Sequence, residues 1–349
     1  MITNQNNKRL YPIIKDRLDE AYARIHETGQ WIDNHYSRSV EKKLKQITGR
    51  KNARLLVSGT AATMVALLAW GVRNKKVACP NYSYVASANQ AALINKVDFF
   101  DVDNRALMTL DENFNHDAVI PVSLYGNTID YDNLKISKHT KLIVDCAQSL
   151  GSLYKNKPDG SFGDVAIFSF ARNKPVPTAG TAGALVWDDD KFSDMVSAVS
   201  NNGKKGRNTS IQNFGLNALP MELQAAQIDI GLDYIDDWQN KRKRIHNFYE
   251  SEFRKLPVKI IQSPEYNDSN YHKFAMLTAD RDRLIKYLAE SNIDALAHYT
   301  DNFANFFGSD KKFPNTDMFC SEIVTLPNNA WMTDNEIEKV AKKVKDFYI

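Results

Sequence analysis

The segment that decides the fold runs from Asp145 to Lys174 and reads DCAQSLGSLYKNKPDGSFGDVAIFSFARNK. An apolar run at residues 142–144 leads directly into Asp145, and a second, at 165–168, leads into Ser169. Short continuous apolar runs are typical of strands buried on both faces, so both polar side chains should emerge where a strand ends. Open α/β sheets carry their chemistry at that edge.

This segment brings a carboxylate, a hydroxyl and an amine to the same region. A lysine amine such as that of Lys174 forms a Schiff base with a carbonyl. A carboxylate such as that of Asp145 pairs with a protonated ring nitrogen. An amine and an anion in this relation are what pyridoxal phosphate (PLP) requires, so the segment predicts a PLP site.

The rest of the first half predicts a mainly parallel seven-stranded sheet covered by helices, because short apolar runs alternate with helix-like segments. The seven runs lie at residues 55–57, 77–79, 97–100, 119–122, 142–144, 165–168 and 184–187. Ser58, Gly59 and Thr60 separate the first strand from an apolar helix at 61–70. Backbone N–H groups at a helix start bind phosphate, so a phosphate is expected there.

A second, smaller α+β domain is expected at the C-terminus. One long helical pattern at residues 221–255 connects the two domains. Three strands and two helices should follow, with Thr333 and Glu336 forming a capping box for the last helix. We therefore divide the chain into a large cofactor-binding domain at 1–235 and a small domain at 236–349, with the N-terminal segment able to pack on the small one.

Composition limits the classes of function. The 349 residues leave room for about two domains, and a net charge of +3 is too small to indicate a nucleic-acid partner. The N-terminal residues have no apolar signal-peptide core, and no apolar run is long enough to span a bilayer. We expect a cytoplasmic protein without membrane contact. The three cysteines lack metal-type spacing, so neither a metal nor a disulfide is expected.

Motifs along nearly the whole chain resemble one family, the DegT-like (DegT/DnrJ/StrS-type) sugar aminotransferases. These are PLP enzymes with the aspartate aminotransferase fold (PLP fold type I). The motifs include Gly29-Gln30-Trp31-Ile32, Ser58-Gly59-Thr60-Ala61-Ala62, Pro80-Asn81-Tyr82-Ser83-Tyr84, Pro121-Val122-Ser123-Leu124-Tyr125-Gly126, the 145–174 segment, Gly215-Leu216-Asn217 and Met221-Glu222-Leu223-Gln224.

The resemblance implies catalytic roles for two residues. Lys174 would carry the cofactor as a Schiff base and shuttle protons between cofactor and substrate carbons. Asp145 would pair with the pyridine nitrogen and keep it protonated. Considered alone, each has an ordinary alternative, a solvated loop lysine and a strand-end aspartate that caps a turn.

Five further residues would bind the cofactor by resemblance. Gln148 matches the position beside the phenolic oxygen, and Tyr84 matches the aromatic residue that stacks on the ring. Gly59, Thr60 and Ser169 match the phosphate cradle. A buried core tyrosine and an ordinary helix cap are the alternatives for these residue types.

The resemblance also implies a homodimer with shared active sites. Asn217 matches an asparagine that the neighbouring subunit lends to the cofactor phosphate, although a turn asparagine fits the pattern too. Trp31, His298 and Tyr299 are candidate substrate residues, the last two because they resemble a histidine-tyrosine pair near the sugar pocket. A structural histidine is equally compatible with this sequence.

The implied function is transfer of an amino group from L-glutamate to a nucleotide-linked keto-sugar, for surface polysaccharide or glycoconjugate synthesis. Inosose aminotransferase and aminohydroxybenzoate synthase activities share every cofactor residue. A sugar dehydratase would carry histidine in place of Lys174, and a non-catalytic binding or regulatory protein should have lost the lysine or Asp145. A nicotinamide site would need a Gly-x-Gly-x-x-Gly turn, which residues 58–63 do not form.

Two regions depart from the family pattern. Residues 175–183 lack the nearly continuous glycine run, so the backbone near the cofactor is expected to follow a different path. The segment 299–327 is shorter than the corresponding family segment, so the resemblance does not identify the substrate that the pocket binds.

Overall fold

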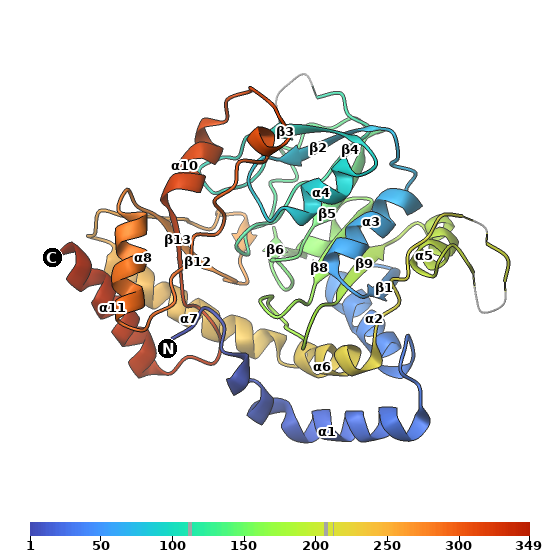
Figure 1. Ribbon diagram of the computed structural model, residues 1–349, viewed down its shortest axis with the longest axis horizontal. Helices are drawn as coiled ribbons and strands as arrows, with labels where there is room; N and C mark the ends of the chain where they lie inside the picture. The colour runs from blue at the N-terminus through green and yellow to red at the C-terminus, as the bar shows by residue number, and fades with distance from the viewer. Residues whose placement is uncertain (111–113, 206–208, 212) are drawn as a thin grey trace.

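The computed structural model describes residues 1–110, 114–205, 209–211 and 213–349 and is built around a seven-stranded sheet (Figure 1). The strand order is β1-β9-β8-β5-β4-β2-β3, and only β9 runs antiparallel to its neighbours. All seven predicted strands are confirmed, as β1 (Asn52–Leu56), β2 (Lys76–Pro80), β3 (Lys96–Phe100), β4 (Ala118–Val119), β5 (Lys141–Asp145), β8 (Val165–Ser169) and β9 (Gly183–Trp187).

Helices cover both faces of this sheet. In β8, Val165 and Ile167 pack against α3 (Gly59–Ala69), α4 (Ala86–Ala92) and α5 (Ser193–Ser200), while Ala166 and Phe168 pack against α1 (Tyr11–Thr28), α2 (His35–Thr48) and α6 (Glu222–Leu232). Successive side chains of a strand point to opposite faces, so a strand between two helical layers must be apolar throughout. This is why the strands read as continuous apolar runs.

The prediction of one helix over residues 221–255 was wrong. The structure has two helices, α6 and α7 (Ile235–Phe253), separated at Asp233. Asp233 forms ion pairs with Arg17 of α1 and Lys43 of α2. Helical periodicity cannot reveal these partners, which come from distant parts of the chain. Helix α7 still links two cores. Trp238, in its N-terminal half, packs beside the large sheet, and the C-terminal half of α7 packs in the second core.

The second core contains the sheet β10-β12-β13, with β10 (Lys259–Ile260), β12 (Phe274–Leu277) and β13 (Ile323–Leu326), and the helices α8 (Arg281–Glu290) and α11 (Asp334–Tyr348). The predicted capping box of Thr333 and Glu336 is present at the start of α11. Ile2 also packs in this core and forms an isolated β-bridge with Ile293, so the N-terminal segment reaches the C-terminal part of the molecule.

Several short elements were not predicted. They are α9 (Phe303–Phe306), α10 (Pro314–Glu322), the small sheet of β6 (Leu153–Tyr154), β7 (Lys157–Pro158) and β11 (Asn267–Asp268), and the 3-10 turns η1 (Asn7–Arg9), η2 (Asp159–Ser161) and η3 (Asp190–Phe192). The elements of two to four residues are too short to leave a periodic signal, and α10, although nine residues long, buries only Thr316 and Phe319 and so shows no apolar stripe. Within the described ranges, no helix combines the length and the apolar character needed to cross a membrane.

Candidate active site

A cavity of about 430 Å³ lies where β5 and β8 end and α3 begins. Nine of the eleven predicted site residues line it, namely Gly59, Thr60, Tyr84, Asp145, Gln148, Ser169, Lys174, His298 and Tyr299. The other two, Trp31 and Asn217, do not line this cavity and are exposed on the surface of the same chain. Their predicted roles toward a substrate and a partner subunit stay predictions.

The start of α3 provides an anion site at one end of the cavity. The Ser58 hydroxyl accepts a hydrogen bond from the Ala61 amide at 3.0 Å. The first amides of a helix have no intrahelical acceptor, so those of Gly59 and Thr60 remain for a ligand. A methyl group on Gly59 would lie 3.0 Å from the Ser169 Cβ, so glycine permits the close approach between α3 and the end of β8.

Gly183 ends the glycine-poor segment that follows Lys174, and its position explains why a glycine is kept there. A Cβ at this position would lie 2.3 Å from the Gly59 nitrogen and 2.4 Å from the Ser58 carbonyl carbon. Real Cβ atoms do not come this close to backbone atoms. Residue 183 must therefore be glycine for β9 to pack against the start of α3. The chain therefore keeps a glycine where the cradle requires it, although the run as a whole is absent.

Asp145 is held rigidly at the end of β5. Its side chain is buried, with one carboxylate oxygen accepting from the Ser87 hydroxyl at 2.5 Å and the other from the Ala147 amide at 3.0 Å. Charge-assisted hydrogen bonds of this kind fix the orientation of a carboxylate. Ser87 was not identified from the sequence. Its signal was weak, a small polar residue in the helix that follows Tyr84.

Lys174 lies in the loop after β8, where its backbone amide donates to the Ala171 carbonyl at 2.9 Å. Burial lowers the pKa of its amine, and the nearby Asp145 carboxylate partly opposes this effect. Its amine forms no ion pair with any carboxylate in the described ranges. Desolvation disfavours the charged ammonium, so this lysine is prepared to react as a neutral amine.

Gln148, Tyr299 and Tyr84 also line the cavity and contact one another. The Gln148 side-chain amide donates to the Tyr299 hydroxyl at 3.1 Å, and its carbonyl oxygen accepts from the Tyr125 amide at 3.0 Å. The ring centroids of Tyr84 and Tyr299 lie 5.9 Å apart. Burial raises the pKa of Tyr299, which keeps its hydroxyl protonated.

His298 lies beside Tyr299 and is held by a 2.8 Å hydrogen bond between its Nδ1 and the Thr325 hydroxyl. Burial, together with the positive charges of Lys273 and Lys174, lowers the pKa of His298 to about 3. The imidazole is therefore neutral at physiological pH. It can donate or accept a hydrogen bond at the cavity without adding charge.

These groups fit PLP. The amides of α3 and the Ser169 hydroxyl suit a phosphate, the fixed Asp145 carboxylate suits a protonated ring nitrogen, and Lys174 presents an amine of lowered pKa. Gly59 and Gly183 allow the end of β8, the start of β9 and the start of α3 to pack closely around this anion site. Nothing in the cavity requires a different cofactor.

A model of the DegT/DnrJ/EryC1/StrS aminotransferase family matches residues 12–345. The chain belongs to this family. It is thus a PLP-dependent aminotransferase, and the predicted fold, cofactor and enzyme class are confirmed.

Related proteins support the same class. The chain is 28% identical over 348 residues to a dTDP-3-amino-3,6-dideoxy-alpha-D-galactopyranose transaminase from Aneurinibacillus thermoaerophilus, with 95% of each chain covered. It is 29% identical over 331 residues to a UDP-4-amino-4,6-dideoxy-N-acetyl-beta-L-altrosamine transaminase from Campylobacter jejuni, covering 88% of this chain and 87% of that one. The crystal structure of DesV from S. venezuelae in complex with a ketimine intermediate has the same fold, with a TM-score of 0.94, 23% identity and coverage of 99% and 98%.

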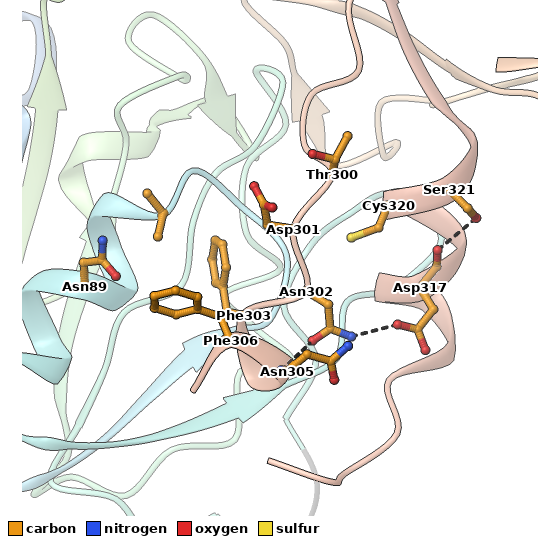
Figure 2. A pocket seen from close by; sticks show the side chains of 11 residues that line it. Asn89, Thr300, Asp301, Asn302, Phe303, Asn305, Phe306, Asp317, Cys320 and Ser321 are labelled. Carbon is orange, nitrogen blue, oxygen red and sulfur yellow. Dashed lines mark hydrogen bonds between the residues drawn. The ribbon is translucent and has the colours of Figure 1, made fainter. Parts of the chain in front are cut away.

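A second cavity of about 620 Å³ adjoins the first in this aminotransferase. Val85 lines it between Tyr84 and Ala86, which line the first cavity, and Thr300 lines it immediately after Tyr299. Figure 2 shows the rings of Phe303 and Phe306 between α4 and α10, with amide and carboxylate side chains around them. Among its described lining residues there is no lysine or arginine.

Proposed function

We propose that this aminotransferase moves the amino group of L-glutamate to the keto group of a nucleotide-linked sugar, in the cytoplasm, for polysaccharide or glycoconjugate synthesis. The observation that carries the proposal is the Lys174 amine. Burial lowers its pKa, and Lys174 lines the same cavity as Asp145. Related transaminases are named for dTDP- and UDP-linked amino sugars, so the sugar-nucleotide class is supported and the nucleotide is left open.

PLP, when bound, supplies an electron sink for the substrate carbon. The chain supplies the proton transfers and the orientation. The neutral Lys174 amine takes a proton from the α-carbon of glutamate and later delivers one to the former keto carbon of the sugar. Asp145, fixed by Ser87 and Ala147, holds a proton on the ring nitrogen. Amides at the start of α3 would hold the phosphate and so keep the ring in place.

The remote part of the sugar substrate is proposed to lie in the second cavity. Its Phe306 ring, which is 79% exposed, offers a stacking surface, and the Asn305 side chain offers amide hydrogen bonds (Figure 2). Asp301 and the absence of cationic lining residues in the described ranges disfavour the diphosphate itself here. A nucleoside base and ribose fit these surfaces better, because every base presents a face that stacks on aromatic rings.

Replacement of Phe306 tests this placement. Base stacking contributes about 1–3 kcal/mol on alanine substitution, so Phe306→Ala should raise the half-saturating concentration of nucleotide-linked sugar at least about fivefold. The half-saturating concentration of glutamate should not change. Phe307→Ala, the adjacent residue outside the cavity, is the matched control. Equal half-saturating concentrations of the nucleotide-linked sugar in the two variants would refute the placement of the nucleoside in this cavity.

A homodimer with shared sites is part of the proposal. Trp31, Ile32 and Met221 are large apolar residues that are 45%, 57% and 48% exposed. They adjoin one another, because Ile32 and Met221 form a β-bridge. Such a patch is typical of an interface, and a second copy covering it is expected to bring Asn217 to the neighbouring cavity.

Spectroscopy tests the reaction. The visible spectrum of the protein with PLP should change to that of pyridoxamine phosphate when L-glutamate is added, and Lys174→Ala should show no such change. Purified UDP- and dTDP-linked keto-sugars should then restore the original spectrum. If the wild-type spectrum did not change with glutamate but changed with another amino acid, that amino acid would be the donor instead of glutamate. A spectrum that ignores all amino acids would refute the transaminase proposal.

Complementation tests the shared site. Lys174→Ala and Asn217→Ala should each lose activity as pure homodimers. A mixture unfolded and refolded together should recover up to about a quarter of wild-type activity, because each hybrid dimer contains one site with both residues intact. A mixture as inactive as its components would show that Asn217 serves the site of its own subunit, and an active Asn217→Ala homodimer would show that it serves no site.

A further inference from the structure

Arg242 of α7 is buried close to Lys174 without a compensating charge. Its side chain is 5% exposed, and it pairs with no carboxylate in the part of the chain that the structure describes. Its Nη1 donates to the carbonyl of Pro175, the residue after Lys174, at 3.4 Å, and its Nε donates to the Asn270 carbonyl at 3.0 Å. Burying an unpaired guanidinium costs several kcal/mol.

Asn270 extends this contact to Gln148, which lines the same cavity as Lys174. It is fully buried, and its side-chain amide donates to the carbonyls of Gln148 and Leu150, both at 2.9 Å. Its side-chain oxygen accepts from the His272 amide at 2.9 Å. Every polar group of the Asn270 side chain is therefore in use, which fixes it firmly.

Together these bonds join the two loops that carry the active-site residues. One loop follows β8 and holds Lys174, and the other follows Asp145 at the end of β5 and holds Gln148. In the described structure the bonds run from the Pro175 carbonyl through Arg242 and Asn270 to the Gln148 carbonyl. Helix α7 packs in both cores, so it provides a rigid support for this connection.

We propose that Arg242 is a positioning residue, and that it and Asn270 form a clamp that holds the Lys174 loop against the Gln148 loop. The clamp keeps the Lys174 amine inside the cavity, at a fixed place relative to Asp145. The inference rests on the proposed role of Lys174 as the amine that transfers protons. A displacement of about 1 Å from the reacting geometry lowers a rate by up to about a hundredfold, so such support matters.

The apoprotein provides a test that needs no turnover. Burial lowers the pKa of the Lys174 amine, so a loosened loop should let water reach the amine and raise its pKa toward the usual value. Asp145 favours the charged amine, whereas Lys174 itself lowers the pKa of Lys273, His272 and His298. None of these neighbours is changed in the variant, and the charge of Arg242 is not among the causes that shift the pKa of Lys174, so a shift can be assigned to the clamp.

The pH midpoint of Lys174 acetylation by acetic anhydride, followed by peptide mass spectrometry, measures this pKa. Arg242→Met should raise the midpoint by about one pH unit or more, since one unit corresponds to about 1.4 kcal/mol of changed solvation. Arg244→Met is the matched control, because Arg244 lies two residues further on, with its side chain 64% exposed and paired with Asp334. Arg242→Lys, which retains a charged donor, should lie nearer to wild type than Arg242→Met.

The half-reaction provides the second readout. With PLP bound, single-turnover conversion by glutamate should slow about tenfold or more in Arg242→Met, with an unchanged half-saturating glutamate concentration. A wild-type midpoint and a wild-type rate in folded Arg242→Met would overturn the clamp. If that variant does not fold, Arg242→Gln replaces it in both measurements. If the wild-type protein with PLP did not react with glutamate, the proposed function would fail. The pH midpoint of Lys174 acetylation in the apoprotein would still test the clamp.

Discussion

Lys273 precedes β12 and is a buried amine whose removal should stabilise the protein. Only 8% of it is exposed, and burial together with the charges of Lys174 and Arg242 lowers its pKa to about 8, with Asp294 opposing. An unfolded lysine has a pKa of about 10.4. The folded state therefore holds fewer protons than the unfolded state between these values, and its stability rises with pH across that window.

The magnitude follows from the difference between the two pKa values. At pH 7 the buried lysine costs about 3 kcal/mol, because each pKa unit corresponds to about 1.4 kcal/mol. Lys273→Met removes that cost and keeps the chain volume. With an unfolding entropy of about 2.1 cal/mol/K per residue, the variant should melt roughly 4 °C higher at pH 7. At pH 9.5 the advantage should shrink to about 1.4 kcal/mol, because the native lysine is then neutral.

Urea unfolding followed by tryptophan fluorescence at pH 7.0 and 9.5 measures both values. Lys286→Met, on the exposed face of α8, is the matched control and should show no pH-dependent difference from wild type. A Lys273 variant no more stable than wild type at pH 7 would refute the reasoning. A gain of equal size at both pH values would assign the effect to side-chain packing instead of buried charge.

Three substitutions probe the remaining contacts. Gly183→Ala should abolish soluble expression or PLP binding, because its Cβ would collide with backbone at the start of α3, whereas Gly308→Ala, with open space around it, should still fold. Glu222→Gln should lower stability by about 3 kcal/mol in urea unfolding, since the buried carboxylate accepts three backbone N–H bonds at the start of α2. Tyr299→Phe removes the acceptor of the Gln148 amide, so PLP affinity measured by titration should fall about fivefold, and an unchanged affinity would separate this pair from the cofactor.

The sequence was sufficient to predict the sheet and most of the cavity for a physical reason. Strands buried on both faces are continuous apolar runs, and the polar residue that ends each run must lie at the sheet edge. Asp145 and Ser169 were found in this way, and Lys174 follows in the same loop. Residues that join the site from distant segments had no such signal, and Ser87 and the break at Asp233 are examples.

Arg242 illustrates a signal that was present but concealed. It lies within the charged run 241–244, which has the composition of a solvated helix face. Yet Trp238, Arg242, Ile245 and Tyr249 follow the spacing of one buried stripe on α7. Helical spacing therefore places Arg242 inside, whereas its charge suggests the surface. The buried stripe determines the outcome because α7 packs in both cores.

The same conflict explains the electrostatics of the site. Arg242, Lys273 and Lys174 are cations buried near one another, and Asp145 is the carboxylate that shares the cavity with Lys174. In a poorly solvated interior the charges of Lys174 and Arg242 discourage the protonation of Lys273, whereas burial itself lowers the pKa of Lys174 and Arg242. A protein that only needed stability would replace these side chains with apolar ones, as Lys273→Met does. A protein that needs a reactive amine at Lys174 gains from the burial that lowers its pKa, so lower stability and a reactive lysine arise from the same poorly solvated interior.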